Sequence, residues 1–180
     1  APAEPLDNRN QESEVVVMSV QKDGACHLNI GSEKAQPVHC KTLEPRYKLV
    51  GEEAWNTGKA KGICGSAVID AVAELFRAGI IDSRGRFKNG AESKRVREGE
   101  NGPEYVIAWA EETSIGRDIP MTQQDVRQIQ LAKAALFVAA RTLLKRSNLQ
   151  TPDKIILAGG FGSFIDKEKA MLIGLIPDCE

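Results

Sequence analysis

The chain has 180 residues, of which 42% are hydrophobic and 27% charged, and its 24 Lys and Arg residues nearly balance 25 Asp and Glu residues. This is the composition of an ordinary globular protein, without the basic excess of a nucleic-acid or anionic-membrane binder. No apolar run approaches the ~20 residues that span a bilayer. We therefore expect neither nucleic acid nor membrane as a partner.

The first stretch of the chain, residues 1–13, is polar and acidic, and we expect it to be loosely ordered. It lacks the apolar core of a signal peptide and an initiator Met, so we expect a processed chain or a fragment. The four cysteines form no CxxC pair, and their lone thiols indicate a reducing cytoplasm. Cys26-His27 and His39-Cys40 could in principle hold a metal, but we interpret them as hairpin residues and predict no metal site.

The first half of the chain predicts short strands. Glu14–Val20 is a β-branched run, and the turn Gln21–Gly24 is followed by Ala25–Ile30, which alternates apolar and polar residues. Val38–Leu43 suits a third strand, and Lys48–Gly51 could add an edge. Together these segments predict a small antiparallel meander.

A helix is predicted over Ser66–Arg77, since apolar residues recur there at helical spacing. Gly65 and Ser66 stand at its start, and Ser66 is a suitable N-cap. A glycine at a helix start lets backbone N–H groups approach an anion. The alternative, which local physics favours, is a plain capped helix without a ligand.

The middle of the chain alternates between surface and core patterns. Residues 82–103 mix acidic and basic side chains with glycine and predict a solvated loop. Glu104–Ala110 predicts a strand. A long helix is expected over Thr122–Lys145, with Thr122 as N-cap and Asp125 completing a capping box.

The last stretch predicts a strand, a glycine turn and a helix. Ile155–Ala158 is a continuous apolar run, typical of a strand buried on both faces, and Asp166–Gly174 has helical spacing. Glycines at 159, 160 and 162 would let the backbone approach a nucleotide at the helix start. A tight turn that binds nothing is the equal alternative. We expect the later strands to be parallel, which gives an α/β fold with a mixed sheet and flanking helices.

Three stretches in order resemble one family. They are KGICGSAVIDAVAELFRAGIID, MTQQDVRQIQLAKAALFVAARTLL and KIILAGGFGSFIDKEKAMLIGLIPD, within residues 59–180. The chain resembles the C-terminal part of the actin-like (ASKHA) ATPase domain of the reductive activators of corrinoid proteins. The resemblance implies a ribonuclease-H-like, actin-like subdomain over residues 14–180. It also implies that ATP and Mg²⁺ drive the return of cob(II)alamin in a corrinoid protein to cob(I)alamin.

The resemblance carries over to particular residues. The adenosine motif of the family corresponds to Gly159, Gly160, Phe161, Gly162 and Ser163. Gln130 and Lys133 lie one helical turn apart and are expected on the adenine or ribose side of the cleft, the alternative being two surface residues of an amphipathic helix. Gly65 and Ser66 are a further candidate element that faces the cleft. The catalytic residues stay unassigned.

The departures from the family limit these expectations. No phosphate loop of the Asp-Gly-Gly-Thr kind and no iron–sulfur cysteine cluster occur in the sequence. We therefore expect a fragment that neither hydrolyses ATP nor carries the electron alone, within a homodimeric parent that holds the iron–sulfur cluster. Two alternatives stay open: a nucleotide-independent docking module for a corrinoid protein, and an actin-like activator of another metalloenzyme.

Overall fold

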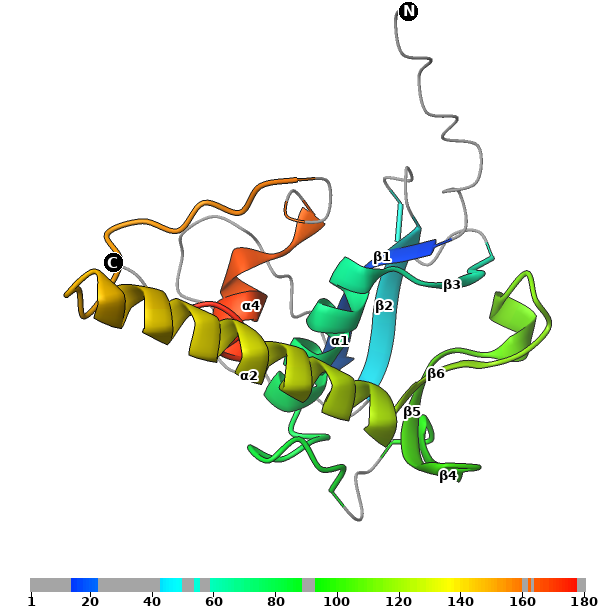
Figure 1. The fold of residues 1–180 in the computed structure, drawn as a ribbon. Coiled ribbons are helices and arrows are strands. Elements are labelled where there is room, and N and C mark those ends of the chain that lie inside the picture. Colours follow the sequence, from blue (N-terminus) through cyan, green and yellow to red (C-terminus); the bar gives the residue numbers. More distant parts are fainter. Residues whose placement is uncertain are drawn as a thin grey trace, which may run out of the picture.

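The computed structural model describes residues 14–22, 43–49, 54–55, 59–88, 93–159, 162 and 164–177. Within these residues the chain forms two three-stranded sheets and three α-helices (Figure 1). The fold is α/β, as the sequence predicts. Cys26-His27 and His39-Cys40 lie outside the described residues.

The first sheet has the order β2-β1-β3. β1 (Glu14–Lys22) pairs antiparallel with β2 (Leu43–Leu49), which confirms an early antiparallel arrangement. β3 (Gly62–Ile63) adds a short parallel pairing to the start of β1. The strand predicted over Ala25–Ile30 lies outside the described residues, and the predicted edge at Lys48–Gly51 overlaps the end of β2.

The second sheet, β4-β5-β6, is antiparallel throughout, so the prediction that later strands are parallel is wrong. It consists of β4 (Val96–Gly99), β5 (Gly102–Ala108) and β6 (Ile119–Thr122). The two residues between β4 and β5 allow only a hairpin, because a parallel crossover needs a dozen residues or more. The prediction of a solvated loop over residues 82–103 is therefore wrong at β4, whose charged side chains point to solvent.

The helices are α1 (Gly65–Arg77), α2 (Gln123–Arg146) and α4 (Lys167–Leu172). The predicted cap of α2 is confirmed: the Thr122 side chain accepts from Asp125 N–H, and the Asp125 carboxylate accepts from Thr122 N–H over 2.8 Å. The predicted Ser66 cap of α1 is wrong. The extended backbone of Cys64 places the N-cap there, so Ser66 lies inside the first turn and is buried.

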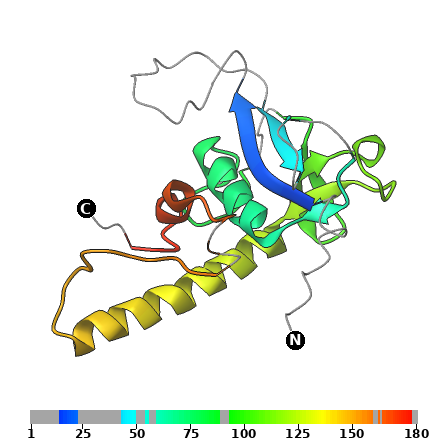
Figure 2. The ribbon, with the colours of Figure 1, turned by 90° about the horizontal axis from the view of Figure 1, so that it is seen from above.

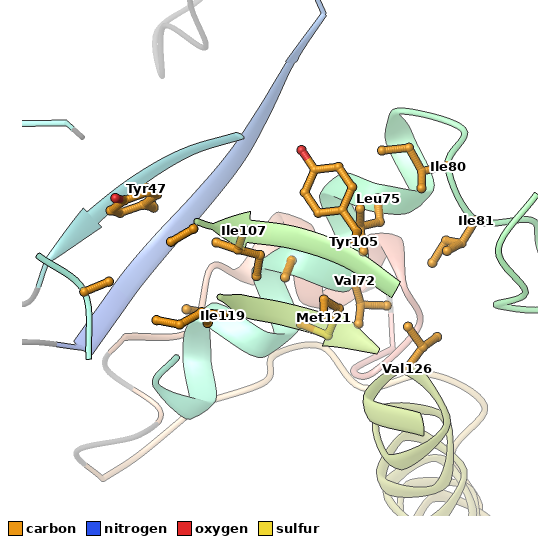
Figure 3. Close-up of a cluster of buried hydrophobic side chains, with 14 of the residues drawn as sticks. Tyr47, Val72, Leu75, Ile80, Ile81, Tyr105, Ile107, Ile119, Met121 and Val126 are labelled. Atoms are coloured by element: carbon orange, nitrogen blue, oxygen red, sulfur yellow. The ribbon is translucent and has the colours of Figure 1, made fainter. Parts of the chain in front are cut away.

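The core lies between α1, the second sheet and the start of α2 (Figure 3). Leu75 of α1, Tyr105 and Ile107 of β5, and Val126 of α2 are completely buried. Full burial of an aliphatic or aromatic side chain is worth roughly 1.5–3 kcal/mol. This contact therefore fixes the amino-terminal half of α2 against α1.

The predicted buried strand at Ile155–Ala158 is wrong. The segment is extended but belongs to no sheet, and Ile156 is 75% exposed. A strand is buried only when neighbouring strands satisfy its N–H and C=O groups, and no described residue pairs with this segment. It runs back past the carboxyl-terminal half of α2, which extends away from both sheets (Figure 2).

Candidate functional site

A cavity of about 120 Å³ lies between α1, α2, α4 and the turn at residues 82–85. Gln130 and Lys133 of α2 both line it, as their helical spacing predicts. Gln130 Nε2 donates to Arg84 O over 2.8 Å, and Gln130 Oε1 accepts from Arg127 over 3.2 Å. Gln130 is therefore held in place by hydrogen bonds before any ligand arrives.

Two glycines with left-handed backbone make room for these side chains. Gly85 (φ 68°) lies against the Gln130 amide, and Gly174 (φ 70°) lies against the end of Lys133. A Cβ on Gly174 would lie 3.1 Å from Lys133 Nζ, and one on Gly85 would collide with Gln130 Nε2. Because L side chains rarely adopt this backbone, both positions favour glycine for conformation as well as space.

The turn beside the cavity adds a carboxylate, that of Asp82, to the lining that includes Lys133. Asp82 Oδ1 accepts from the backbone N–H groups of Arg84 and Arg86 over 2.8 and 2.9 Å. These hydrogen bonds, first that from Arg86, hold the pKa of Asp82 below its usual value, so the carboxylate stays ionised. The sequence pattern placed this turn in a solvated loop, since nothing local indicates that Arg84 meets Gln130.

The chemistry of the lining suits a flat, partly polar group. The cavity walls are mostly aliphatic and aromatic, with Asp82, Ser83, Gln130 and Lys133 as the polar members. Ligand pockets usually measure about 300–1,000 Å³. At about 120 Å³, the cavity is smaller than this range.

The glycine turn borders a different hollow. Gly159 is exposed with a left-handed backbone (φ 93°), and Gly162 lines a larger hollow of about 470 Å³ on the Met171 side of α4. The structure does not describe Gly160, Phe161 and Ser163. Gln130 and Lys133 therefore share one cavity, whereas Gly159 and Gly162 do not line it. α4 contributes residues to both hollows.

The start of α1 is the third predicted element and borders neither hollow. Gly65 is exposed, and the Ser66 hydroxyl lies 3.2 Å from Cys64 Sγ. Among the described residues, no group of three or more His, Cys, Asp or Glu could hold a metal ion. Within the same residues, no helix is long and apolar enough to cross a membrane.

Comparison with known proteins identifies the family. The sequence model described as the C-terminal domain of RACo, the ASKHA domain, matches residues 30–180. The corrinoid activation enzyme RamQ of Eubacterium limosum is 38% identical over 154 residues, which cover 81% of this chain and 25% of that protein. A solved reductive activator for a corrinoid, iron–sulfur protein is 36% identical with a TM-score of 0.74, covering 93% of this chain and 23% of that one.

The chain thus spans about a quarter of the length of these two proteins. Because the family match extends over most of the sequence, from residue 30 to residue 180, it includes both hollows and all three helices. The chain belongs to the family of the C-terminal ASKHA domain of reductive activators of corrinoid proteins.

Proposed function

We propose that this chain contributes the adenosine side of a nucleotide cleft in an ATP-dependent reductive activator. The longer protein would return cob(II)alamin in a corrinoid protein to cob(I)alamin. Membership in the family and the two relatives named for corrinoid activation support this role. The observation that carries the proposal is the convergence of Gln130 and Lys133 on one cavity beside α4.

In this proposal the Gln130 amide and the Lys133 ammonium contact the base or ribose. The glycine motif, residues 159–163, would bring backbone N–H groups to the nucleotide. Gly65 and Ser66 at the start of α1 border neither hollow and would meet the nucleotide only outside them. ATP, when bound with Mg²⁺, would supply the free energy of the uphill electron transfer. Segments of a longer protein would hold the phosphates, the metal ion and the iron–sulfur cluster.

Binding of Mg-ATP to the chain tests the cleft directly. Lys133→Met and Gln130→Leu should each weaken binding about tenfold, the loss of one polar contact worth about 1.4 kcal/mol. Lys145→Met and Gln128→Leu are matched controls, since both residues are exposed on α2 and neither lines the cavity. Equal affinities for all four variants would exclude the cavity as the base site.

The reaction itself is tested in a longer protein that contains this domain and an iron–sulfur module. With a low-potential electron donor and a corrinoid protein, ATP should accelerate the loss of the cob(II)alamin absorbance. Lys133→Met should slow the ATP-dependent rate, and Lys145→Met should not. A rate that is the same with and without ATP would refute the proposed activity.

A second candidate function is a docking module that binds a corrinoid protein without nucleotide. The exposed apolar side chains on the carboxyl-terminal half of α2, among them Leu136, Val138 and Leu143, favour it. The isolated chain should then capture a corrinoid protein whether or not Gly160 is replaced by Trp. Under either function we place the protein in the cytoplasm, as a homodimer in its longer form, with neither nucleic acid nor membrane as a partner.

A further inference from the structure

Three buried ionisable side chains join α1 to α4. Lys169 Nζ of α4 lies 3.6 Å from Asp70 Oδ2 and 3.5 Å from Glu74 Oε1, both of α1. Their residues are 4%, 2% and 3% exposed, respectively. Lys, Asp and Glu are almost never fully buried unless paired, and removing one partner of a buried pair costs far more than the pair contributes. The cluster is therefore a specific connection between the two helices.

The three buried side chains carry two carboxylates against one ammonium. Both carboxylates share the ammonium of Lys169, and among the described residues Glu74 also pairs with the partly exposed Arg77 over 3.4 Å. Asp166 of α4 adds a further negative charge near Asp70. Among the described residues, Asp70 Oδ1 has no hydrogen-bond partner. Burial, against the attraction of Lys169, raises the pKa of Asp70 to about 7.

The position of the cluster gives it a role. α4 begins just after the glycine turn, and its far end supplies Leu172 and Ile173 to the cavity that contains Gln130 and Lys133. Lys169 itself lines neither hollow. We propose that the cluster of Lys169, Asp70 and Glu74 is a positioning element that fixes α4, and with it the glycine turn, onto α1.

This element is sensitive to protonation. When Asp70 is neutral, the charge of the Lys169 ammonium balances that of the Glu74 carboxylate. When Asp70 is ionised, a second buried negative charge competes for Lys169. Asp70 faces Lys169 and Asp166 from α4 and Glu74 from its own helix. Ionisation of Asp70 near pH 7 should therefore shift α4 and the turn relative to α1. The relevance of that shift to nucleotide binding rests on the function proposed above.

Amide chemical shifts between pH 5.5 and 8.5, without nucleotide, test the positioning role. In the native chain the amides of Gly159, Gly162, Ala170 and Ile173 should move with a common midpoint near pH 7. In Asp70→Asn this midpoint should vanish, and in Glu168→Gln, which neutralises an exposed carboxylate on α4, it should persist. A midpoint near pH 7 that survives in Asp70→Asn would overturn the proposal.

A second variant tests the role of the Lys169 ammonium. Lys169→Met should displace the same four amide signals, whereas Lys145→Met, at an exposed position on α2, should leave all but its immediate neighbours unchanged. Unchanged signals at Gly159 and Gly162 in folded Lys169→Met would overturn the proposal. If Lys169→Met does not fold, the chemical-shift titration of Asp70→Asn decides whether the cluster positions α4.

Mg-ATP affinity separates this inference from the proposed function. The native chain should bind Mg-ATP several-fold more weakly at pH 8 than at pH 6, and Asp70→Asn should bind equally at both values. An Asp70→Asn variant with the native pH profile would overturn the functional role of the cluster. A native chain that binds no Mg-ATP at either pH contradicts the nucleotide cleft, and the chemical-shift titration then decides the positioning role alone.

Discussion

Arg95 Nε donates to Glu44 Oε2 over 2.5 Å and so joins the second sheet to β2 of the first. Nη1 of the same guanidinium donates to Val106 O and Ile107 O over 3.2 and 3.1 Å. Arg95 is only 8% exposed, whereas the Glu44 side chain is half exposed. The stabilisation therefore comes mainly from the two buried carbonyl contacts, since water screens the ion pair.

Arg95→Met should lower the free energy of unfolding by about 2–4 kcal/mol, because it leaves buried carbonyl oxygens without a donor. Chemical denaturation followed by circular dichroism measures this loss. Arg117→Met is the matched control at an exposed position and should change stability by less than about 0.5 kcal/mol. Equal effects of the two substitutions would mean that Arg95 does not connect the sheets.

The capping box of α2 offers a test of local structure. The Thr122 hydroxyl lies 2.6 Å from Asp125 Oδ2 and accepts from Asp125 N–H over 3.1 Å. Thr122→Ala should cost about 1 kcal/mol of unfolding free energy. Thr142→Ala, at an exposed position away from the ends of the same helix, should be neutral or slightly stabilising, because alanine has the higher helix propensity. Thermal unfolding of both variants measures the difference.

The sequence predicted features that depend on neighbours along the chain. The Thr122–Asp125 cap and the shared face of Gln130 and Lys133 follow from spacings of three residues, and both are present. The contact between Gln130 and Arg84 spans 46 positions and has no local signal. The sequence therefore predicted the helix but not its contact with this turn.

The two wrong predictions about strands, at β4 and at Ile155–Ala158, have a related physical cause. β4 carries exposed charges and becomes a strand only because β5 supplies its hydrogen bonds. The converse holds at Ile155–Ala158, which has the composition of a buried strand but lacks a partner among the described residues. Composition indicates that a segment can form a strand, and pairing decides whether it does.

The two tyrosines should resist alkaline titration in the folded chain. Tyr105 is completely buried and its hydroxyl donates to Leu43 O over 2.7 Å, and burial raises the pKa of its phenol above 10. Burial, followed by the nearby charge of Glu112, also raises the pKa of Tyr47. Both groups therefore contribute stability that is present below pH ~10 and is lost as the pH rises further.

Ultraviolet difference absorbance measures this behaviour. The phenolate band should be absent near pH 10 in the folded chain and should appear together with unfolding at higher pH. Tyr105→Phe, which removes the hydrogen bond to Leu43 O, should cost about 1 kcal/mol at neutral pH. A reversible phenolate titration near pH 10 without unfolding would contradict the burial of both rings.

Asp70 should give stability an unusual dependence on pH. Its folded pKa of about 7 lies above the usual value of 3.8, so the folded state holds the proton more tightly than the unfolded state. Its contribution to stability is full below pH ~4 and falls as the pH rises to about 7, by up to about 4 kcal/mol. Asp70→Asn should therefore gain stability relative to the native chain between pH 5 and pH 8, measured by denaturant midpoints. A constant difference across this range would contradict the raised pKa.

The exposed apolar side chains within residues 131–140 of α2 should form a surface that associates without contributing to stability. Residues 131–140 contain a single charged side chain, Lys133, and Leu131, Leu136, Phe137 and Val138 are all at least 48% exposed. A helix that is apolar all round is normally buried. Val138→Lys should therefore reduce self-association in analytical ultracentrifugation and change the free energy of unfolding by less than about 0.5 kcal/mol. Val126→Lys, at the buried end of the same helix, should prevent folding, because it buries an unpaired charge in the core. Unfolding of the chain by Val138→Lys would mean that this face is already covered.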